Sequence, residues 1–404
     1  MFSSFRTSSH ARYWMFASEA EVDAKRQATH AAAIDKVAQA SNEAGAAANT
    51  SETAPEPPPP PVPREDGELL CARYELKLQE LCDDENTRDP TRFTKKVLCT
   101  AQTYLKRFYL HVSPMEEDPK GVMLAALYLA GKVEEERIQV TDLVPKYAKL
   151  QPHALLALEL RLMEALRFQL VVRSPFRCLT GLLHALHGHV TERAGAGGAT
   201  DETNAEIERL HRGSIDHVKR TLRTNSIFIH SPQQIALAAL LSAASHADLK
   251  TSAIDVRGWI ETRFGSDGEG GGAAKSEGSA PLLEQLARVQ QASSSPELDG
   301  EVSNERLKAI DSQLRKVWKL MKRVEKEKEE QKAKEEHERF ASRKPSEAEA
   351  ANTLRVKAEL EKLEGEARAA AAALTAADAA GTRKRRRGDD ASDGKGSVVK
   401  KEAP

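Results

Sequence analysis

A lysine and three glutamates close an apolar stretch in the first half of the chain. Residues 119–131 read PKGVMLAALYLAG, Lys132 follows directly, and Glu134, Glu135 and Glu136 come next. A lysine in the last turn of a helix is stabilised by the negative end of the helix dipole, which is sufficient to explain its presence. Its ammonium also has three N–H donors for oxygen atoms of a partner. The sequence leaves two interpretations, a helix-terminal charge and a binding residue.

Residue types that carry catalysis or hold metals are present, but they do not form a recognised pattern. The 12 histidines include no H-E-x-x-H pair, and no G-x-G-x-x-G, Walker-type or G-x-S-x-G motif occurs. The cysteines are scattered without a C-x-x-C pair, which argues against structural zinc and predicts reduced, mostly buried thiols at Cys71, Cys82, Cys99 and Cys178. We predict no catalytic residue, no metal and no cofactor.

The charges of the chain balance one another. It has 60 Lys and Arg against 61 Asp and Glu, a formal net charge of -1, so no overall field favours nucleic acid. The longest apolar run, Val122 to Ala130, is far shorter than the roughly 20 residues that cross a bilayer, and the N-terminus has no signal-peptide core. We expect a soluble, intracellular protein that binds neither nucleic acid directly nor a membrane.

The elements that position these residues are predicted to be helices, because strand-type alternation is missing. Three Asp-Pro or Ser-Pro pairs, at residues 118, 174 and 231, combine a capping side chain with proline at the first helical position. Between residues 67 and 168 the pattern predicts five helices, over 67–82, 92–110, 119–134, 140–149 and 152–168. The fold class predicted is all-α.

An internal repeat predicts two copies of one helical domain. Residues 119–130 and 232–243 share the pattern Pro-x-x-Val/Ile-x-Leu-Ala-Ala-Leu-x-x-Ala. A helix that is apolar on nearly all sides is surrounded by other helices, so each copy has a central helix. The match is short and rich in alanine, and chance similarity of two buried helices is the alternative.

Further segments flank these two domains. Apolar residues at three-and-four spacing from Leu307 to Val324 predict a helix over 304–325; the charged run after it makes a long coiled coil the weaker alternative. The predicted organisation is an N-terminal helical segment (1–40), an Ala/Pro-rich linker (41–66), a first domain (67–172), a second domain with two Gly-rich insertions (173–325), and a charged C-terminal helix with a disordered tail (326–404).

Three segments resemble the cyclin family. CTAQTYLKRFYL (99–110), PKGVMLAALYLAGKVEEE (119–136) and ALELRLMEALRFQL (157–170) look like the second, third and fifth helices of a cyclin box. RYWMFASEAEV (12–22) and SPQQIALAALLSAAS (231–245) are similar to segments of the H-type members. The resemblance implies two tandem five-helix cyclin folds with flanking terminal helices.

In cyclins, the lysine that closes the third helix and a glutamate early in the fifth contact the activating helix of a cyclin-dependent kinase. Lys132 and Glu159 occupy these positions, and an exposed ion pair within the chain is the alternative. Glu135 is a candidate rim charge. Tyr104 and Phe108 are candidate apolar contacts to the kinase, although core packing is the commoner role for such residues.

Two large apolar residues, Trp14 and Phe16, lie in a terminal segment that otherwise has little to pack. We expect them to dock on the first cyclin fold or on the kinase. A basic run is predicted to be a nuclear localisation signal, against a phosphate-binding patch or a mere charge run, and consists of Arg383, Lys384, Arg385, Arg386 and Arg387. The expected location is the nucleus.

The resemblance implies a regulatory subunit and not an enzyme. Its partners would be a kinase of the cyclin-dependent kinase 7 type, a RING-finger assembly factor and the core of the transcription factor TFIIH. Another transcriptional cyclin remains an alternative. A nucleic-acid-binding protein of the TFIIB kind is a weaker one, because its zinc ribbon with paired C-x-x-C motifs is missing from this sequence.

Overall fold

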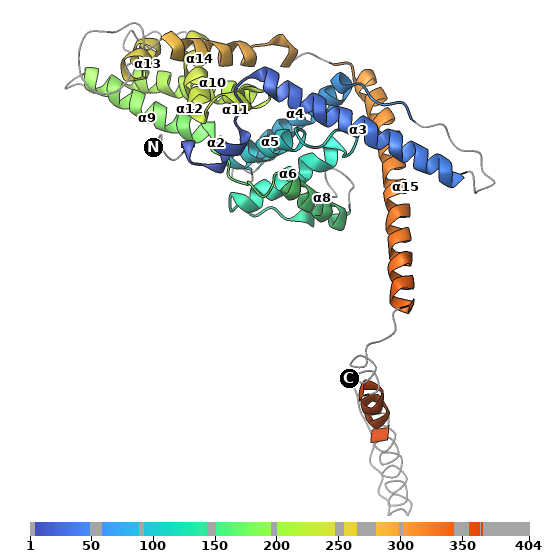
Figure 1. Ribbon diagram of the computed structural model, residues 1–404. Coiled ribbons are helices and arrows are strands. Elements are labelled where there is room, and N and C mark those ends of the chain that lie inside the picture. Colours follow the sequence, from blue (N-terminus) through green and yellow to red (C-terminus); the bar gives the residue numbers. More distant parts are fainter. Residues whose placement is uncertain are drawn as a thin grey trace, which may run out of the picture. The chain divides into compact units, whose positions relative to one another are not determined.

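The computed structural model describes residues 5–48, 59–88, 93–141, 143, 151–194, 200–246, 254–264, 280–298, 302–342, 355–363 and 365–366. Within these ranges every regular element is a helix, which confirms the all-α prediction (Figure 1). The chain divides into two compact units, Met1–Lys326 and Glu327–Pro404. None of the described helices is both long and apolar enough to cross a membrane.

The N-terminal segment forms α2 (Ser9–Trp14) and α3 (Glu19–Ala48). A capping box opens α3, because Ser18 Oγ accepts a hydrogen bond from Glu21 N at 3.4 Å and Glu21 Oε2 accepts one from Ala17 N at 2.8 Å. The helix does not stop near residue 40, where the linker was expected. It continues to Ala48 because Ala40 and Ala44 are buried against the C-terminal helix.

The first helical domain contains α4 (Arg64–Arg88), α5 (Lys95–Phe108), α6 (Pro119–Val133) and α8 (Pro152–Ala165). Helix α6 is its centre and packs against the other three. Asp118 caps α6 by accepting from Lys120 N at 3.0 Å, ahead of the first-turn proline. Helix α4 begins inside the predicted linker, three residues before the predicted domain. The predicted helix over 140–149 lies mostly outside the described residues.

The second helical domain consists of α9 (Pro175–Ala194), α10 (Asp201–Leu222), α11 (Ser226–Ile229), α12 (Pro232–His246), α13 (Val256–Phe264), α14 (Ala280–Ser293) and the short η2 (Pro296–Leu298). Helix α12 packs against α9, α10, α13 and α14. It has 15 residues, as α6 does, and both begin at the proline of the repeated pattern. The repeat therefore marks the central helix of each domain. Residues 195–199 and 265–279 of the Gly-rich insertions lie outside the described residues.

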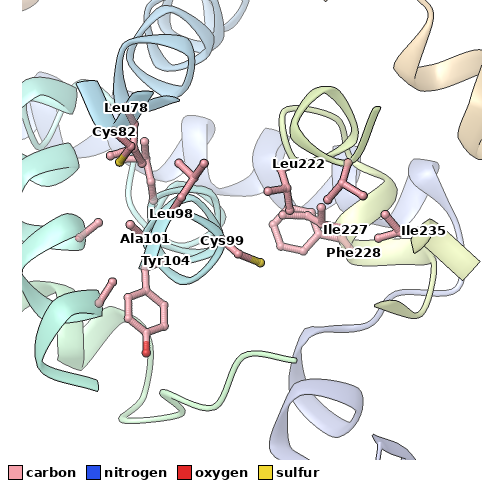
Figure 2. Close-up of a cluster of buried hydrophobic side chains, with 14 of the residues drawn as sticks. Leu78, Cys82, Leu98, Cys99, Ala101, Tyr104, Leu222, Ile227, Phe228 and Ile235 are labelled. Carbon is pink, nitrogen blue, oxygen red and sulfur yellow. The ribbon is translucent and has the colours of Figure 1, made fainter. Parts of the chain in front are cut away.

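One apolar core runs through both helical domains. Figure 2 shows α5 between α4, which contributes Leu78 and Cys82, and second-domain residues that include Leu222 and Phe228. Cys99 of α5 points toward the second-domain side in this view. Since α5 is buried along most of its length, it supports both domains.

The C-terminal helix α15 covers Asn304–Ser342 and is longer than the predicted 304–325. Its first part packs on the core through Ile310, Leu314 and Val317, and Trp318 Nε1 donates to Pro114 O at 2.9 Å. From residue 327 to 339 every described side chain is exposed. The helix continues there because Lys and Glu are strong helix formers that need no core. A separate helix is present over residues 355–363.

Candidate functional site

Lys132 and Glu159 form an ion pair between the end of α6 and the middle of α8. The Lys132 Nζ atom lies 2.7 Å from Glu159 Oε1 and 2.9 Å from Oε2. The two side chains differ in exposure: 47% of Lys132 and 8% of Glu159 is accessible. The pair thus has a buried carboxylate that fixes an accessible ammonium group in place.

The environment of Lys132 keeps it charged. Its Nζ also lies 4.3 Å from the ring centroid of Tyr128, one helical turn earlier. Burial lowers the pKa of Lys132, but the hydrogen bond and charge of Glu159 and the contact with Tyr128 outweigh it, so the pKa is raised. At neutral pH the group is a permanent cation with N–H capacity left for a second acceptor.

The glutamates after α6 are held by a turn and have different roles. Glu136 N donates to Gly131 O at 2.8 Å while Glu135 takes a left-handed φ of 64°, the bond pattern of a helix C-terminal cap. Glu134 turns back to α5 and accepts from Thr100 Oγ1 at 2.7 Å. Of these three glutamates only Glu135 is exposed, and its role as a rim charge stays a prediction.

Exposed apolar side chains occur near the ion-pair residues in the sequence, on α6, on α8 and just after α8. On α8, Leu156 and Leu160 are 46% and 51% accessible and lie one turn apart on either side of Glu159 in sequence. Val133 follows Lys132 and is 37% accessible. With Phe168 and Val171, they make up what we call the exposed apolar set: Val133, Leu156, Leu160, Phe168 and Val171.

Phe168 is presented by an unusual turn. Both Arg167 and Phe168 adopt left-handed φ values, 51° and 57°, a conformation that costs roughly 1–2 kcal/mol for each residue with a side chain. The turn ends α8, since Phe168 N donates to Met163 O at 2.9 Å, and it leaves the ring 62% accessible. Such strain at an exposed aromatic residue suggests a functional constraint.

Two of the residues predicted to contact a kinase lie in the core instead. Tyr104 and Phe108 are 0% and 1% accessible, so they offer no surface to a partner, and the expectation of direct contact is wrong. They face inward because α5 lies between the two domains. Tyr104 still acts on the site: its hydroxyl donates to Leu170 O at 2.6 Å, which anchors the segment after Phe168.

Trp14 and Phe16 dock on the helical domains of this chain. Trp14 is 2% accessible, with its ring 4.7 Å from the guanidinium of Arg107. Phe16 packs edge-to-face on Phe228 at 6.0 Å, and its N–H donates to the carbonyl of the same residue at 2.7 Å. Trp14 therefore contacts the first domain and Phe16 the second, and neither ring adjoins the Lys132–Glu159 pair.

The sequence did not single out Leu156 and Leu160. Leucine, alanine and methionine occur on every side of α8, so no apolar face can be recognised from spacing alone. The one signal in the sequence that could have pointed to them was their closeness to Glu159, because Leu156 lies three residues before it and Leu160 one residue after it. The basic run 383–387 lies outside the described residues.

Comparison with known families accounts for both domains. The family described as "Cyclin, N-terminal domain" matches residues 87–171, and "Cyclin C-terminal domain" matches residues 174–326. Together these ranges cover more than half of the chain. A chain of the CAK complex from Chaetomium thermophilum, bound to ATP-gamma-S, has a similar fold with a TM-score of 0.61 at 22% identity, covering 86% of this chain and 97% of that one.

Curated relatives include two cyclin types at nearly equal identity. Cyclin-H1-1 of Arabidopsis thaliana is 29% identical over 172 residues, covering 43% of this chain and 47% of that protein. Cyclin-C1-1 of the same plant is 30% identical over 175 residues, covering 41% and 60%. The chain thus spans about half of the length of these relatives. The two matched domains and the tandem helical fold place the chain in the cyclin family.

Proposed function

We propose that this chain is the regulatory subunit that binds and activates a kinase of the cyclin-dependent kinase 7 type. It would act in a CDK-activating kinase and in TFIIH-linked phosphorylation of RNA polymerase II and of cell-cycle kinases. The observation that supports the proposal is the Lys132–Glu159 pair, in which a buried carboxylate holds a half-accessible ammonium group, with exposed apolar side chains nearby in the sequence. The chain itself contributes no catalytic residue to this activity.

The mechanism is a shift between two kinase conformations. The surface around Lys132 binds the conformation in which the activating helix of the kinase is turned inward, and the difference in affinity sets how far the equilibrium moves. In that conformation the kinase's own lysine and glutamate pair positions ATP. Lys132 donates to carbonyl oxygens at the end of the partner helix, and Glu159 holds Lys132 in the binding geometry.

The apolar side chains supply most of the binding free energy in this scheme. Burial of a large aromatic residue at the centre of an interface typically contributes more than a charge at its rim. Phe168 has the largest exposed fraction of the set, 62%, and its backbone is held by the contact of Tyr104 with Leu170. Glu135, exposed beside Lys132, is assigned to the rim.

The proposed partners beyond the kinase are a RING-finger assembly factor and the TFIIH core. The proposed location is the nucleus, with residues 383–387 as the import signal. Trp14 and Phe16 act at a distance in this proposal, because they fasten the N-terminal segment across both cyclin folds.

The test is an in vitro assay of cyclin-dependent kinase 7 with and without the full chain. We expect the wild type to stimulate the kinase and the Lys132→Ala/Glu159→Ala double variant to lose most of the stimulation. The matched control is Arg257→Ala/Glu261→Ala, which removes an exposed ion pair of 3.1 Å on α13. The control should stimulate the kinase as the wild type does.

Two results would redirect the assignment. If the wild type does not bind kinase 7 but stimulates another transcriptional kinase, the chain is a cyclin of another transcriptional type. If it stimulates no kinase and retards duplex DNA in a binding assay, the TFIIB-like alternative is correct.

A further inference from the structure

Two basic segments from distant parts of the chain meet at the N-terminal helix α2. Residues 5–16 contain two arginines and no acidic residue, and residues 165–179 contain three arginines and no acidic residue. A hydrogen bond of 3.1 Å from Arg173 N to His10 Nδ1 joins the two segments. Negative charge is therefore missing from both sides of this contact.

The buried side chain of Trp14 brings α3 into the same region. Its ring lies 4.7 Å from the guanidinium of Arg107 and 5.6 Å from the ring of His111. Burial lowers the pKa of His111, and Lys25 of α3 and Arg167 lie close enough for their charges to lower it further. The basic side chains of α2, of α3 and of the segment after α8 thus belong to one region of the surface.

Five basic side chains are accessible in this region, and we call them the basic junction: Arg6, Arg12, Lys25, Arg167 and Arg173. In the part of the chain that the structure describes, none of them forms an ion pair. Arg107 is fully buried at the same place, and its Nε and Nη2 atoms have no hydrogen-bond partner among the described residues. Burial lowers the pKa of Arg107 to about 9, so it is still a cation at neutral pH.

Acidic side chains do not balance these charges. Asp23 is held by Arg64 at 2.7 Å. The other acidic residues nearest to the basic junction in the sequence are Glu19, Glu21 and Glu164. With Arg107 counted, six cations therefore stand against three carboxylates. His10 and His111 are neutral at neutral pH, because burial and then the neighbouring cations lower their pKa to about 3 and about 4.

We propose that the basic junction binds a short acidic segment of a protein partner, in which aspartate and glutamate are interspersed with apolar residues. Four of its five side chains are arginines, whose planar guanidinium groups match carboxylates with two parallel hydrogen bonds. Tyr13 follows Arg12 and is 50% accessible, which offers an apolar surface beside the charges. Arg167 precedes Phe168, so the site borders the proposed kinase surface but can be occupied without a kinase.

A peptide suits this surface better than a nucleic acid does. Glu21 and Glu164 lie within about one helical turn of Lys25 and Arg167 in the sequence. Phosphates of a nucleic acid are evenly spaced, so a bound strand would also approach these glutamates and be repelled. A peptide can place neutral residues there and acidic residues at the arginines. The formal net charge of the chain, -1, provides no long-range attraction for a polyanion either.

The experiment is fluorescence anisotropy of the full-length chain with the labelled peptide Asp-Glu-Phe-Asp-Glu-Phe-Asp-Glu at constant ionic strength. We expect saturable binding with a dissociation constant below about 1 mM, and weaker binding at higher salt because the cations are accessible to solvent. The double variant Arg12→Gln/Arg173→Gln removes one cation from each segment but keeps the backbone bond to His10. It should keep the melting temperature of the wild type and bind the peptide at least about tenfold more weakly.

The matched control is Arg257→Gln/Arg288→Gln, which neutralises two exposed arginines of α13 and α14 outside the basic junction. It should bind the peptide as the wild type does. The amide peptide Asn-Gln-Phe-Asn-Gln-Phe-Asn-Gln should not bind, and an oligodeoxythymidine of equal net charge should bind at least about tenfold more weakly. Equal affinity for either of these probes overturns the proposal. Unchanged binding in the folded Arg12→Gln/Arg173→Gln variant, or no binding of the acidic peptide at roughly 1 mM, does so too.

Discussion

Two lysines of similar chemistry have opposite roles because their burial differs. Lys132 is half accessible and pairs with Glu159 at the surface, where a partner can reach it. Lys106 is almost fully buried with Glu75. A carboxylate that neutralises a buried ammonium is required for folding, whereas one that orients an accessible ammonium serves recognition.

At the residue scale, we predict that Glu75→Gln destabilises the fold strongly. Removal of one partner leaves a buried charge without compensation and costs about 3–5 kcal/mol. Glu80→Gln is the control, because Glu80 pairs with Arg73 at 3.4 Å with side chains 50% and 32% accessible, and such pairs contribute about 0–1 kcal/mol. Urea denaturation measures both. Equal effects of the two variants would contradict the role of burial.

Phe168→Gly should change stability and binding in opposite directions. Glycine relieves the left-handed strain at φ 57°, so the free energy of unfolding should rise by about 1 kcal/mol. Loss of the exposed ring should weaken kinase binding about tenfold or more. Tyr13→Gly, which removes another exposed ring of 50% accessibility, should leave kinase binding unchanged. Denaturation and surface plasmon resonance test this, and a variant that binds like the wild type would rule out Phe168 as an anchor.

At the scale of elements, the N-terminal segment fastens the two cyclin folds together. His10 Nδ1 accepts from Arg173 N at 3.1 Å in the connection between the folds. Trp14 then packs on Arg107 of α5, and Phe16 on Phe228 of the second fold. On α3, Thr29 Oγ1 donates to Leu110 O at 2.8 Å. The segment contacts each fold in turn, so its docking depends on both.

The docking should weaken in acid because of His10. Burial, then the charges of Arg107 and Arg173, lowers its pKa from 6.5 to about 3. The unfolded chain takes up a proton near pH 6.5 and the folded chain does not until about pH 3, so stability falls as the pH falls through this window. His10→Gln should reduce the slope of unfolding free energy against pH, while His184→Gln, at an exposed position, should not. Identical slopes in wild type and His10→Gln would exclude this residue as the cause.

At the scale of the whole molecule, the two compact units differ in what supports them. Met1–Lys326 has a core that runs through both cyclin folds and includes the first part of α15. In Glu327–Pro404, every side chain whose exposure is described is exposed, including Val356, Leu360 and Leu363. The described helical residues of that unit depend on local propensity, since none of their side chains whose exposure is described is buried.

Two truncations of the chain within α15 and before it should have different effects on the melting temperature. A chain that ends at Lys326 is expected to keep the melting temperature of the full protein within about 2 °C, because every side chain beyond Lys326 whose exposure is described is exposed. A chain that ends at Ser303 also loses Leu314, Val317 and the Trp318 bond to Pro114, and should melt many degrees lower. Differential scanning calorimetry measures both melting temperatures. Equal values for the two truncated chains would show that the first part of α15 does not stabilise the core.

Local patterns determined the central helices of both domains and the first residues of several helices. The capping pairs before Pro119 and Pro232 and the repeated central helix were recognisable in the sequence, because they depend on residues within one or two turns. The sequence pattern also singled out Lys132 of the ion pair, because a charged residue at the end of an apolar run is conspicuous. The helical organisation of the chain was therefore available without a structure.

Tertiary packing decided which side chains a partner can reach. Tyr104 and Phe108 became core residues because α5 lies between two folds, and Leu156 and Leu160 stayed exposed because α6 covers only one face of α8. The length of α3 and the hydrogen bond from Lys106 to the carbonyl of Arg223 likewise depend on contacts between distant segments. Burial is a property of which helix faces meet, and a pattern of neighbours along one helix does not contain it.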